Sequence, residues 1–187
     1  SGIGTTGFAV VVDIGGGSTE IAAGESVVAQ ARSFDMGSVR LTGRVLPERP
    51  TTRERIANAR KVVDETLGSI PWARGPGQVI GVAGTFTSLS AINLGLDVYD
   101  RSVVDGSRLS LPDINELVEM LRVMTLSETA AIPSLDPKRA PVILAGAVIA
   151  AQTLSAIGAT SVIVSEHDLL DGLANELISA NPGLPAT

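Results

Sequence analysis

A segment near the start of the chain combines glycines with oxygen-bearing side chains, in the order Asp13-Ile-Gly-Gly-Gly-Ser-Thr-Glu20. Glycine permits tight backbone turns and lets a ligand approach N–H groups that a Cβ would shield. Asp13 and Glu20 offer hard oxygen ligands of the kind that Mg²⁺ takes, alongside waters and the phosphates of a substrate. The pattern therefore predicts a loop that holds phosphate and a divalent metal.

The same segment lies between two predicted strands, because an apolar run covers residues 8–12 and a second strand pattern covers residues 19–23. A glycine-rich turn in a hairpin can be no more than a tight turn, and the three glycines alone favour that interpretation. The carboxylates and hydroxyls around the glycines favour a phosphate site instead. The loop does not lead from a strand into a helix, so it is neither a Walker nor a Rossmann loop.

A second candidate ligand loop begins at Ala83-Gly84-Thr85, between a buried strand predicted over residues 79–82 and a helix predicted over residues 86–94. A helix N-terminus presents free N–H groups and the positive end of the helix dipole, and both favour an anion. Thr85 or Thr87 can equally well be an ordinary N-cap of that helix. Both interpretations remain open at this stage.

The elements that must position the two loops follow from hydrophobic spacing. Strands are predicted over residues 8–12, 19–23, 27–31, 79–82 and 161–165, with a short strand or connection over 102–109. Helices are predicted over residues 37–46, 51–67, 86–94, 112–124, 142–157 and 168–179, with a short helix opening at Ser127. Hairpins followed by strand–helix alternation predict an α/β fold with a mixed five-stranded sheet, its first three strands antiparallel, and helices on both faces.

Composition restricts the class of protein. The 187 residues suit one domain or a compact part of a larger enzyme, and 44% hydrophobic with 3% aromatic residues indicates an aliphatic core. The absence of cysteine excludes disulfides, thiolate metal sites and cysteine nucleophiles. The most apolar long stretch, residues 140–151, is shorter than the roughly 20 residues of a membrane-spanning helix. We therefore expect a cytoplasmic protein with no membrane partner.

The net charge of −6 argues against nucleic acid as a partner, because sequence-independent binding to nucleic acid depends on a basic surface. One stretch, from Gly37 to Lys61, is nevertheless basic. Its basic residues are Arg40, Arg44, Arg49, Arg53, Arg55, Arg60 and Lys61. They form either a solvated helix surface or a patch that steers a polyanion toward the first loop. The lone histidine, His167, is interpreted as a loop residue because one histidine cannot make a multi-histidine metal site.

Taken together, these motifs resemble the Ppx/GppA family of exopolyphosphatases and guanosine pentaphosphate phosphohydrolases. The matching segments cover nearly the whole chain in the family's order: residues 13–20, 36–42, 84–89, 143–147 and 162–172. The resemblance implies a ribonuclease-H-like domain of the actin-like ATPase superfamily. It further implies that residues 1–187 are the second of two such domains, so that the first domain of the same protein is an expected partner. Whether the chain also forms a homodimer stays open.

The resemblance also implies roles for individual residues. Asp13 and Glu20 would be the catalytic residues, beside Mg²⁺ or another divalent cation and the attacking water. The phosphate would be held by Gly15, Gly16, Gly17 and Ser18, with Thr19 next to them, while Gly84 and Thr85 would line the opposite wall of the cleft. In the family a catalytic glutamate precedes this domain, and residues 1–12 contain no carboxylate. We therefore expect the isolated chain to be inactive.

The expected function is metal-dependent hydrolysis of a phosphoanhydride, which releases terminal phosphate from inorganic polyphosphate or guanosine pentaphosphate. Two alternatives remain open: a small-molecule kinase of the same superfamily, and a sensor that binds polyphosphate or nucleotide without turnover. The sensor is favoured by one departure from the family. Leu170, in Asp168-Leu-Leu-Asp-Gly172, stands where the family commonly has arginine, and it removes a side chain that could grip phosphate.

Overall fold

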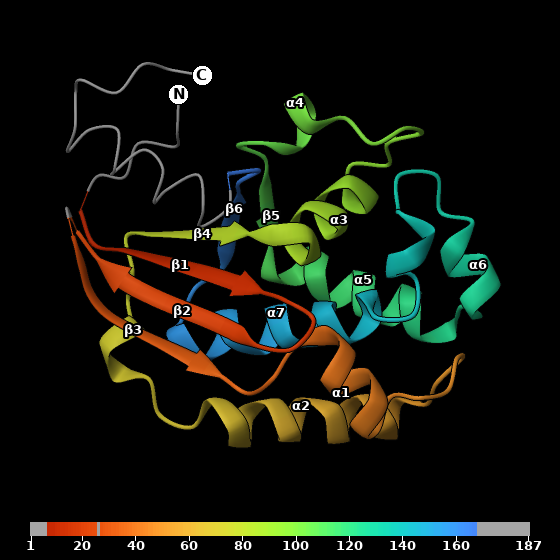
Figure 1. The fold of residues 1–187 in the computed structure, drawn as a ribbon, viewed down its shortest axis with the longest axis horizontal. Coiled ribbons are helices and arrows are strands. Elements are labelled where there is room, and N and C mark those ends of the chain that lie inside the picture. The colour runs from red at the N-terminus through yellow and green to blue at the C-terminus, as the bar shows by residue number, and fades with distance from the viewer. Residues whose placement is uncertain (1–6, 26, 168–187) are drawn as a thin grey trace, which may run out of the picture.

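Six strands form one mixed sheet in the order β3-β2-β1-β4-β6-β5 (Figure 1). The computed structural model describes residues 7–25 and 27–167. The strands are β1 (Ala9–Ile14), β2 (Thr19–Gly24), β3 (Val28–Phe34), β4 (Gln78–Val82), β5 (Arg108–Ser110) and β6 (Ser161–Val164). β1, β2 and β3 are antiparallel neighbours, whereas β4 is parallel to β1 and β6 is parallel to β4.

The antiparallel arrangement of the first three strands is confirmed, but the sheet has six strands and not the predicted five. The additional strand is β5, which pairs antiparallel with β6 at one edge of the sheet. It overlaps the end of the segment 102–109, for which the sequence predicted a short strand or a connection, and extends one residue beyond that segment. A strand of three residues has too little alternation to be distinguished from a loop by its pattern.

The described helices follow the predicted order along the chain, except that α4 lies where the sequence predicted a short strand or connection. They are α1 (Ser38–Val45), α2 (Arg53–Leu67), α3 (Ala83–Asn93), α4 (Arg101–Val104), α5 (Leu111–Val123), α6 (Leu126–Ala130) and α7 (Ile143–Ile157), with short 3₁₀ turns at Pro71–Ala73 and Pro137–Arg139. Thr52 caps α2 by accepting a hydrogen bond from the Arg55 N–H. None of the described helices is long and apolar enough to cross a bilayer.

α3 begins three residues earlier than predicted. Ala83 has a φ of 64°, in the left-handed region that L-residues with a side chain rarely adopt. This conformation turns the chain directly from the end of β4 into the first turn of the helix. The sequence could not show it, because alanine is a strong helix former and does not mark a sharp turn.

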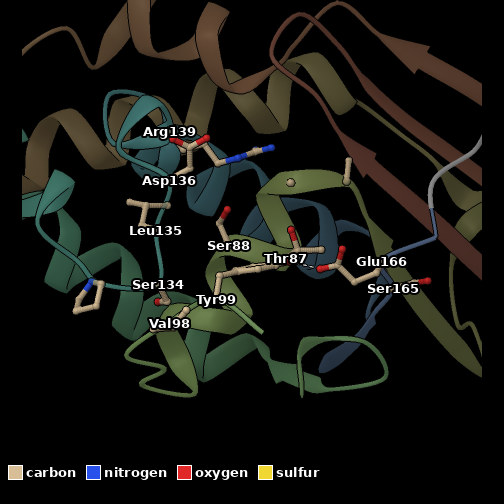
Figure 2. Close-up of a pocket in the computed structure, with 13 residues that line it drawn as sticks. Thr87, Ser88, Val98, Tyr99, Ser134, Leu135, Asp136, Arg139, Ser165 and Glu166 are labelled. Carbon is tan, nitrogen blue, oxygen red and sulfur yellow. Dashed lines mark hydrogen bonds between the residues drawn. The ribbon is translucent and has the colours of Figure 1, made fainter. Parts of the chain in front are cut away.

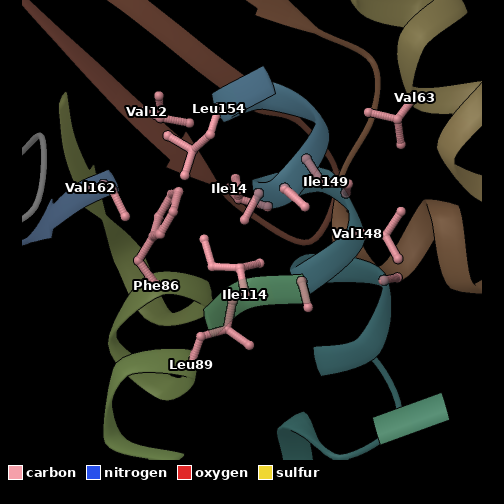
Figure 3. Packing of buried hydrophobic residues seen from close by; sticks show 14 of the residues in the cluster. Val12, Ile14, Val63, Phe86, Leu89, Ile114, Val148, Ile149, Leu154 and Val162 are labelled. Carbon is pink, nitrogen blue, oxygen red and sulfur yellow. The ribbon is translucent and has the colours of Figure 1, made fainter. Parts of the chain in front are cut away.

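The core lies on one face of the sheet, and strand alternation decides which side chains enter it. In β1, Val10, Val12 and Ile14 are buried, while Val11 and Asp13 between them are only partly buried. α3 and α7 contact the sheet, and Figure 3 shows Phe86 and Leu154 packed beside Val12. α7 is buried along most of its length, because α1, α2, α3 and α5 all pack against it.

Gly81 in β4 makes room for this packing. A Cβ at Gly81 would lie 2.5 Å from the ring of Phe86, so only glycine allows α3 to sit close to the strand. Asp13 projects from the face of β1 opposite Val12, and so away from this core. The helix predicted over residues 168–179, which could contribute to the second face, lies outside the described residues.

Candidate functional site

The loop between β1 and β2 is held in one conformation by its own backbone and by helix α1. The Gly15 N–H donates to the carbonyl of Ser18 over 3.0 Å, which closes the turn. The first N–H groups of α1 donate in turn to loop carbonyls, Ser38 to Gly15 over 2.9 Å and Val39 to Gly16 over 3.0 Å. The loop therefore satisfies the N-terminus of α1, which has no side-chain cap.

The contact with α1 uses carbonyls of the loop, those of Gly15 and Gly16, and none of its N–H donors. Within the described part of the chain, the N–H groups of Gly16, Gly17 and Ser18 donate to no backbone or side-chain acceptor. Successive unpaired N–H groups in a tight turn form a concave site that favours an anion. The predicted phosphate loop thus has the donors that its role requires.

Gly37 allows α1 to approach the loop this closely. A Cβ on Gly37 would overlap the carbonyl group of Gly16 and the nitrogen of Gly17. The backbone of Gly37 is extended, with a φ of −137°, so its side chain is excluded by packing and not by conformation. The shape of the loop therefore depends on a glycine 20 residues away along the chain.

The two predicted carboxylates lie directly opposite each other. Asp13 of β1 and Glu20 of β2 are register partners, so their side chains leave the same face of the sheet. Ser33 of β3 continues the row, and its hydroxyl donates to Oε1 of Glu20 over 2.6 Å. Two like charges in directly opposed positions destabilise a sheet, and a divalent cation between them would remove this cost.

The described residues contain no group of three or more histidine, cysteine, aspartate or glutamate side chains arranged to hold a metal. Among the described residues, the predicted donor set is therefore the pair Asp13 and Glu20. That set fits Mg²⁺, which is usually held by one or two carboxylates, several waters and the phosphates of the substrate. It does not fit a structural zinc site, because such a site uses four cysteine or histidine ligands.

The two threonines predicted to bind phosphate use their hydroxyl hydrogens inside the protein. Thr19 is fully buried and donates to the carbonyl of Met36 over 2.6 Å. Thr85 is also buried and donates to the carbonyl of Ile14 over 2.8 Å. Through these hydrogen bonds, Thr19 joins β2 to the segment before α1, and Thr85 joins α3 to the end of β1.

The second loop borders a cavity of about 650 Å³ (Figure 2). Its wall includes Gly84 at the start of α3, and the guanidinium of Arg139 occupies the space where a Cβ of Gly84 would lie. On another wall the Tyr99 hydroxyl donates to the carboxylate of Glu166. Burial, followed by this hydrogen bond, raises the pKa of Tyr99 to about 12. The cavity therefore combines an aromatic ring, a carboxylate and a cation.

Sequence reasoning missed Tyr99, Arg139 and Glu166. Arg139 lies in a proline-flanked stretch that indicated only the approach to a helix, and 55 residues separate it from Gly84. Tyr99 is the only tyrosine of the chain, and this was the one available signal. His167 follows β6 outside any helix or strand, so the prediction of a loop residue is confirmed. Leu170 lies outside the described residues.

Most of the basic stretch forms contacts within the protein surface. Ion pairs join Arg40 to Asp35, Arg53 to Glu119, Arg55 to Glu48 and Lys61 to Glu65. Arg60 donates to Gln152 and Asn115, and Arg49 donates to the carbonyl of Leu121. The ion pairs support the interpretation of a solvated helix surface for most of the stretch, whereas Arg49 lies between α1 and α2 with Nε and Nη1 buried.

Comparison with known proteins places this chain among proteins of one family. The model of the Ppx/GppA phosphatase family matches residues 1–180. The chain belongs to this family. Exopolyphosphatase 2 of Mycobacterium tuberculosis is 40% identical over 176 residues, which are 90% of this chain and 55% of that protein. A bifunctional 3-dehydroquinate synthase/phosphatase of Fusobacterium nucleatum is 31% identical, over 89% of this chain and 26% of that protein.

Solved Ppx/GppA structures share the fold, which is the actin-like, ribonuclease-H-like α/β fold. The Aquifex aeolicus family member superposes with a TM-score of 0.85 at 29% identity, over 95% of this chain and 58% of that one. An exopolyphosphatase from Cytophaga hutchinsonii superposes with a TM-score of 0.79 at 26% identity, over 92% of this chain and 57% of that one. This Ppx/GppA chain therefore spans somewhat more than half the length of these structures and of the tuberculosis relative.

Proposed function

We propose that this chain forms the phosphate-binding wall of a divalent-metal-dependent enzyme that removes terminal phosphate from inorganic polyphosphate. The observation that carries the proposal is the pairing of two features at one end of β1. Three outward N–H groups, from Gly16 to Ser18, follow a strand on which Asp13 faces Glu20. Phosphate oxygens need the donors, and a metal bound to the phosphates needs the carboxylates.

The residues of this chain would act as follows. The N–H groups of Gly16, Gly17 and Ser18 bind oxygens of the terminal phosphoryl group and stabilise the negative charge spread over them during transfer. Asp13 and Glu20 would hold Mg²⁺, which when bound neutralises charge on the phosphates. The water molecule that lies in line with the bond to be broken would be polarised by a carboxylate from the rest of the protein, the general base described below. The Ser33 hydroxyl fixes the carboxylate of Glu20 by donating to it.

The chain spans about half of most relatives, and we propose that the remaining half of the protein supplies the facing wall and the general base. Catalysis requires the base within hydrogen-bond reach of the water, about 3 Å, and a second loop that orients the phosphate. We therefore expect the isolated chain to fold and to hydrolyse polyphosphate negligibly, even with Mg²⁺. Comparable rates for the isolated chain and the full-length protein would contradict this division of roles.

A second candidate substrate, guanosine pentaphosphate, is favoured by the cavity beside Gly84. A volume of about 650 Å³ suits a nucleoside, and Tyr99, Glu166 and Arg139 offer a ring, an acceptor and a cation for its parts. The same cavity would also suit a nucleotide-dependent kinase. The cavity would contribute to binding of guanosine pentaphosphate and not to binding of inorganic polyphosphate, because polyphosphate has no base or ribose to place there.

Phosphate release by the full-length protein from polyphosphate, guanosine pentaphosphate and ATP, measured in parallel with and without Mg²⁺, tests the proposal. We expect magnesium-dependent release from polyphosphate. Substitution of Tyr99 by alanine separates the candidates, since it should raise the KM for the nucleotide and leave that for polyphosphate unchanged. Binding without release from any of the three would support the sensor and overturn the proposal.

A further inference from the structure

Arg40 lies directly beside the phosphate loop. It is in the first turn of α1, and its backbone N–H donates to the carbonyl of Gly16 over 3.3 Å. Its side chain reaches over the neighbouring residue, since a Cβ placed on Gly17 would lie 3.8 Å from Nε of Arg40. The backbone bonds between α1 and the loop fix the backbone of Arg40 beside the loop, so its side chain starts next to Gly16 and Gly17.

The present partner of Arg40 is a weak one. Nη1 of Arg40 lies 2.5 Å from Oδ1 of Asp35, but the side chains are 53% and 79% exposed. Ion pairs this exposed contribute little, because water and salt screen both charges. Asp35 precedes α1 in the chain and contacts Arg40 from the solvent side. A guanidinium held by such a partner can exchange it for a phosphate at low cost.

We propose that Arg40 is a substrate-binding residue, which grips the phosphate next to the terminal one and exchanges Asp35 for it when substrate binds. The inference rests on the proposed function, because the loop must hold the terminal phosphoryl group. It makes the substrate class more specific: a chain of at least two phosphates joined by an anhydride bond. Inorganic phosphate alone would fill the loop without reaching Arg40 productively.

The alternative is that the ion pair only fastens the turn between β3 and α1. The two roles make opposite predictions for the two partners. If Arg40 binds substrate, Asp35 competes with the substrate for Arg40. Removing the Arg40 side chain then lowers the affinity for substrate, whereas removing the charge of Asp35 raises it. If the pair is a structural tie, removing either partner has the same effect.

The test is steady-state phosphate release by the full-length protein from tripolyphosphate and long-chain polyphosphate. We expect Arg40→Ala to raise KM about tenfold, the loss of one charge-assisted hydrogen bond. Asp35→Asn should lower KM about two- to fivefold, the range of an exposed ion pair. Arg40→Lys should restore affinity in part, because lysine keeps the charge but not the fork of donors.

Arg53→Ala is the matched control. Arg53 belongs to the same basic stretch, but it lies at the start of α2 and pairs with Glu119. The substitution removes one exposed positive charge and should leave KM within twofold of the unaltered protein. Equal KM values for Arg40→Ala and Arg53→Ala, or a rise in KM for Asp35→Asn, would overturn the inference while leaving the proposed function intact. No release by the unaltered protein would overturn both.

Discussion

The hydroxyl of Thr85 donates to the carbonyl of Ile14 over 2.8 Å, and so ties the start of α3 to the last residue of β1. Ile14 immediately precedes the phosphate loop, whereas Thr85 belongs to the second ligand loop. This buried hydrogen bond adds to the parallel pairing of β1 and β4 in positioning one loop relative to the other. Any ligand that spans Gly17 and Gly84 depends on this contact.

Substitution of Thr85 by valine should uncouple the two loops. Valine keeps the shape of threonine but leaves the buried carbonyl of Ile14 without its donor, at a cost of about 1–3 kcal/mol. We expect the free energy of unfolding in urea to fall by this amount and phosphate release by the full-length protein to fall with it. Thr85→Ser keeps the donor and serves as the control. Equal stability of the valine and serine variants would show that the hydrogen bond contributes little.

Gly37 and Gly43 provide a matched pair of substitutions, one where α1 touches the loop and one where it does not. A Cβ at Gly37 would overlap Gly16 and Gly17, whereas one at Gly43 would meet nothing within 4 Å. Gly37→Ala should destabilise the protein by about 1–3 kcal/mol through overpacking and displace the phosphate loop. Gly43→Ala should stabilise it by up to about 1 kcal/mol, the difference in helix propensity. Urea unfolding of both variants measures these changes in stability. An unchanged free energy of unfolding for Gly37→Ala would contradict the close approach of Gly37 to the loop.

The titration of Tyr99 tests the geometry of the cavity. Burial and the hydrogen bond to Glu166 raise its pKa to about 12, above the ordinary value of about 10 for tyrosine. Between these two pH values the unfolded chain loses the proton and the folded chain keeps it. The contribution of Tyr99 to stability is therefore present below about pH 10 and lost as the pH rises toward about 12.

Because Tyr99 is the only tyrosine, the ultraviolet absorbance of tyrosinate reports on this residue alone. We expect a midpoint near 12 in the folded protein and near 10 in concentrated urea. Glu166→Gln should lower the folded midpoint, since it removes both the acceptor and the negative charge. Identical midpoints in folded and unfolded protein would mean that Tyr99 does not lie against Glu166.

The sequence predicted a glycine-rich loop between β1 and β2 and most of the elements around it, because both depend on local pattern. The apolar run of β1 ends at a glycine cluster with carboxylates on either side, and a hairpin register places Asp13 and Glu20 opposite each other. This pairing needs no long-range information. The same locality explains why α2 and α7 were placed within a few residues of their observed bounds.

Contacts between distant segments could not be predicted in the same way. The pattern showed that Thr85 could face an anion or cap a helix, and the structure directs its hydroxyl to a carbonyl 71 residues away. Arg139 over Gly84 and Arg40 over Gly17 are likewise products of packing. A single sequence contains no signal for either contact, because local spacing does not show which distant residue a side chain will contact.

The role proposed for Asp13 is metal-dependent phosphate release. It is tested most directly by Asp13→Asn in the full-length protein, with phosphate release from polyphosphate measured across a range of Mg²⁺ concentrations. We expect the rate to fall about a hundredfold or more, the usual cost of losing one group that stabilises charge in the transition state, while thermal unfolding stays within a few degrees of the unaltered protein. A near-normal rate with the same magnesium dependence would contradict the account.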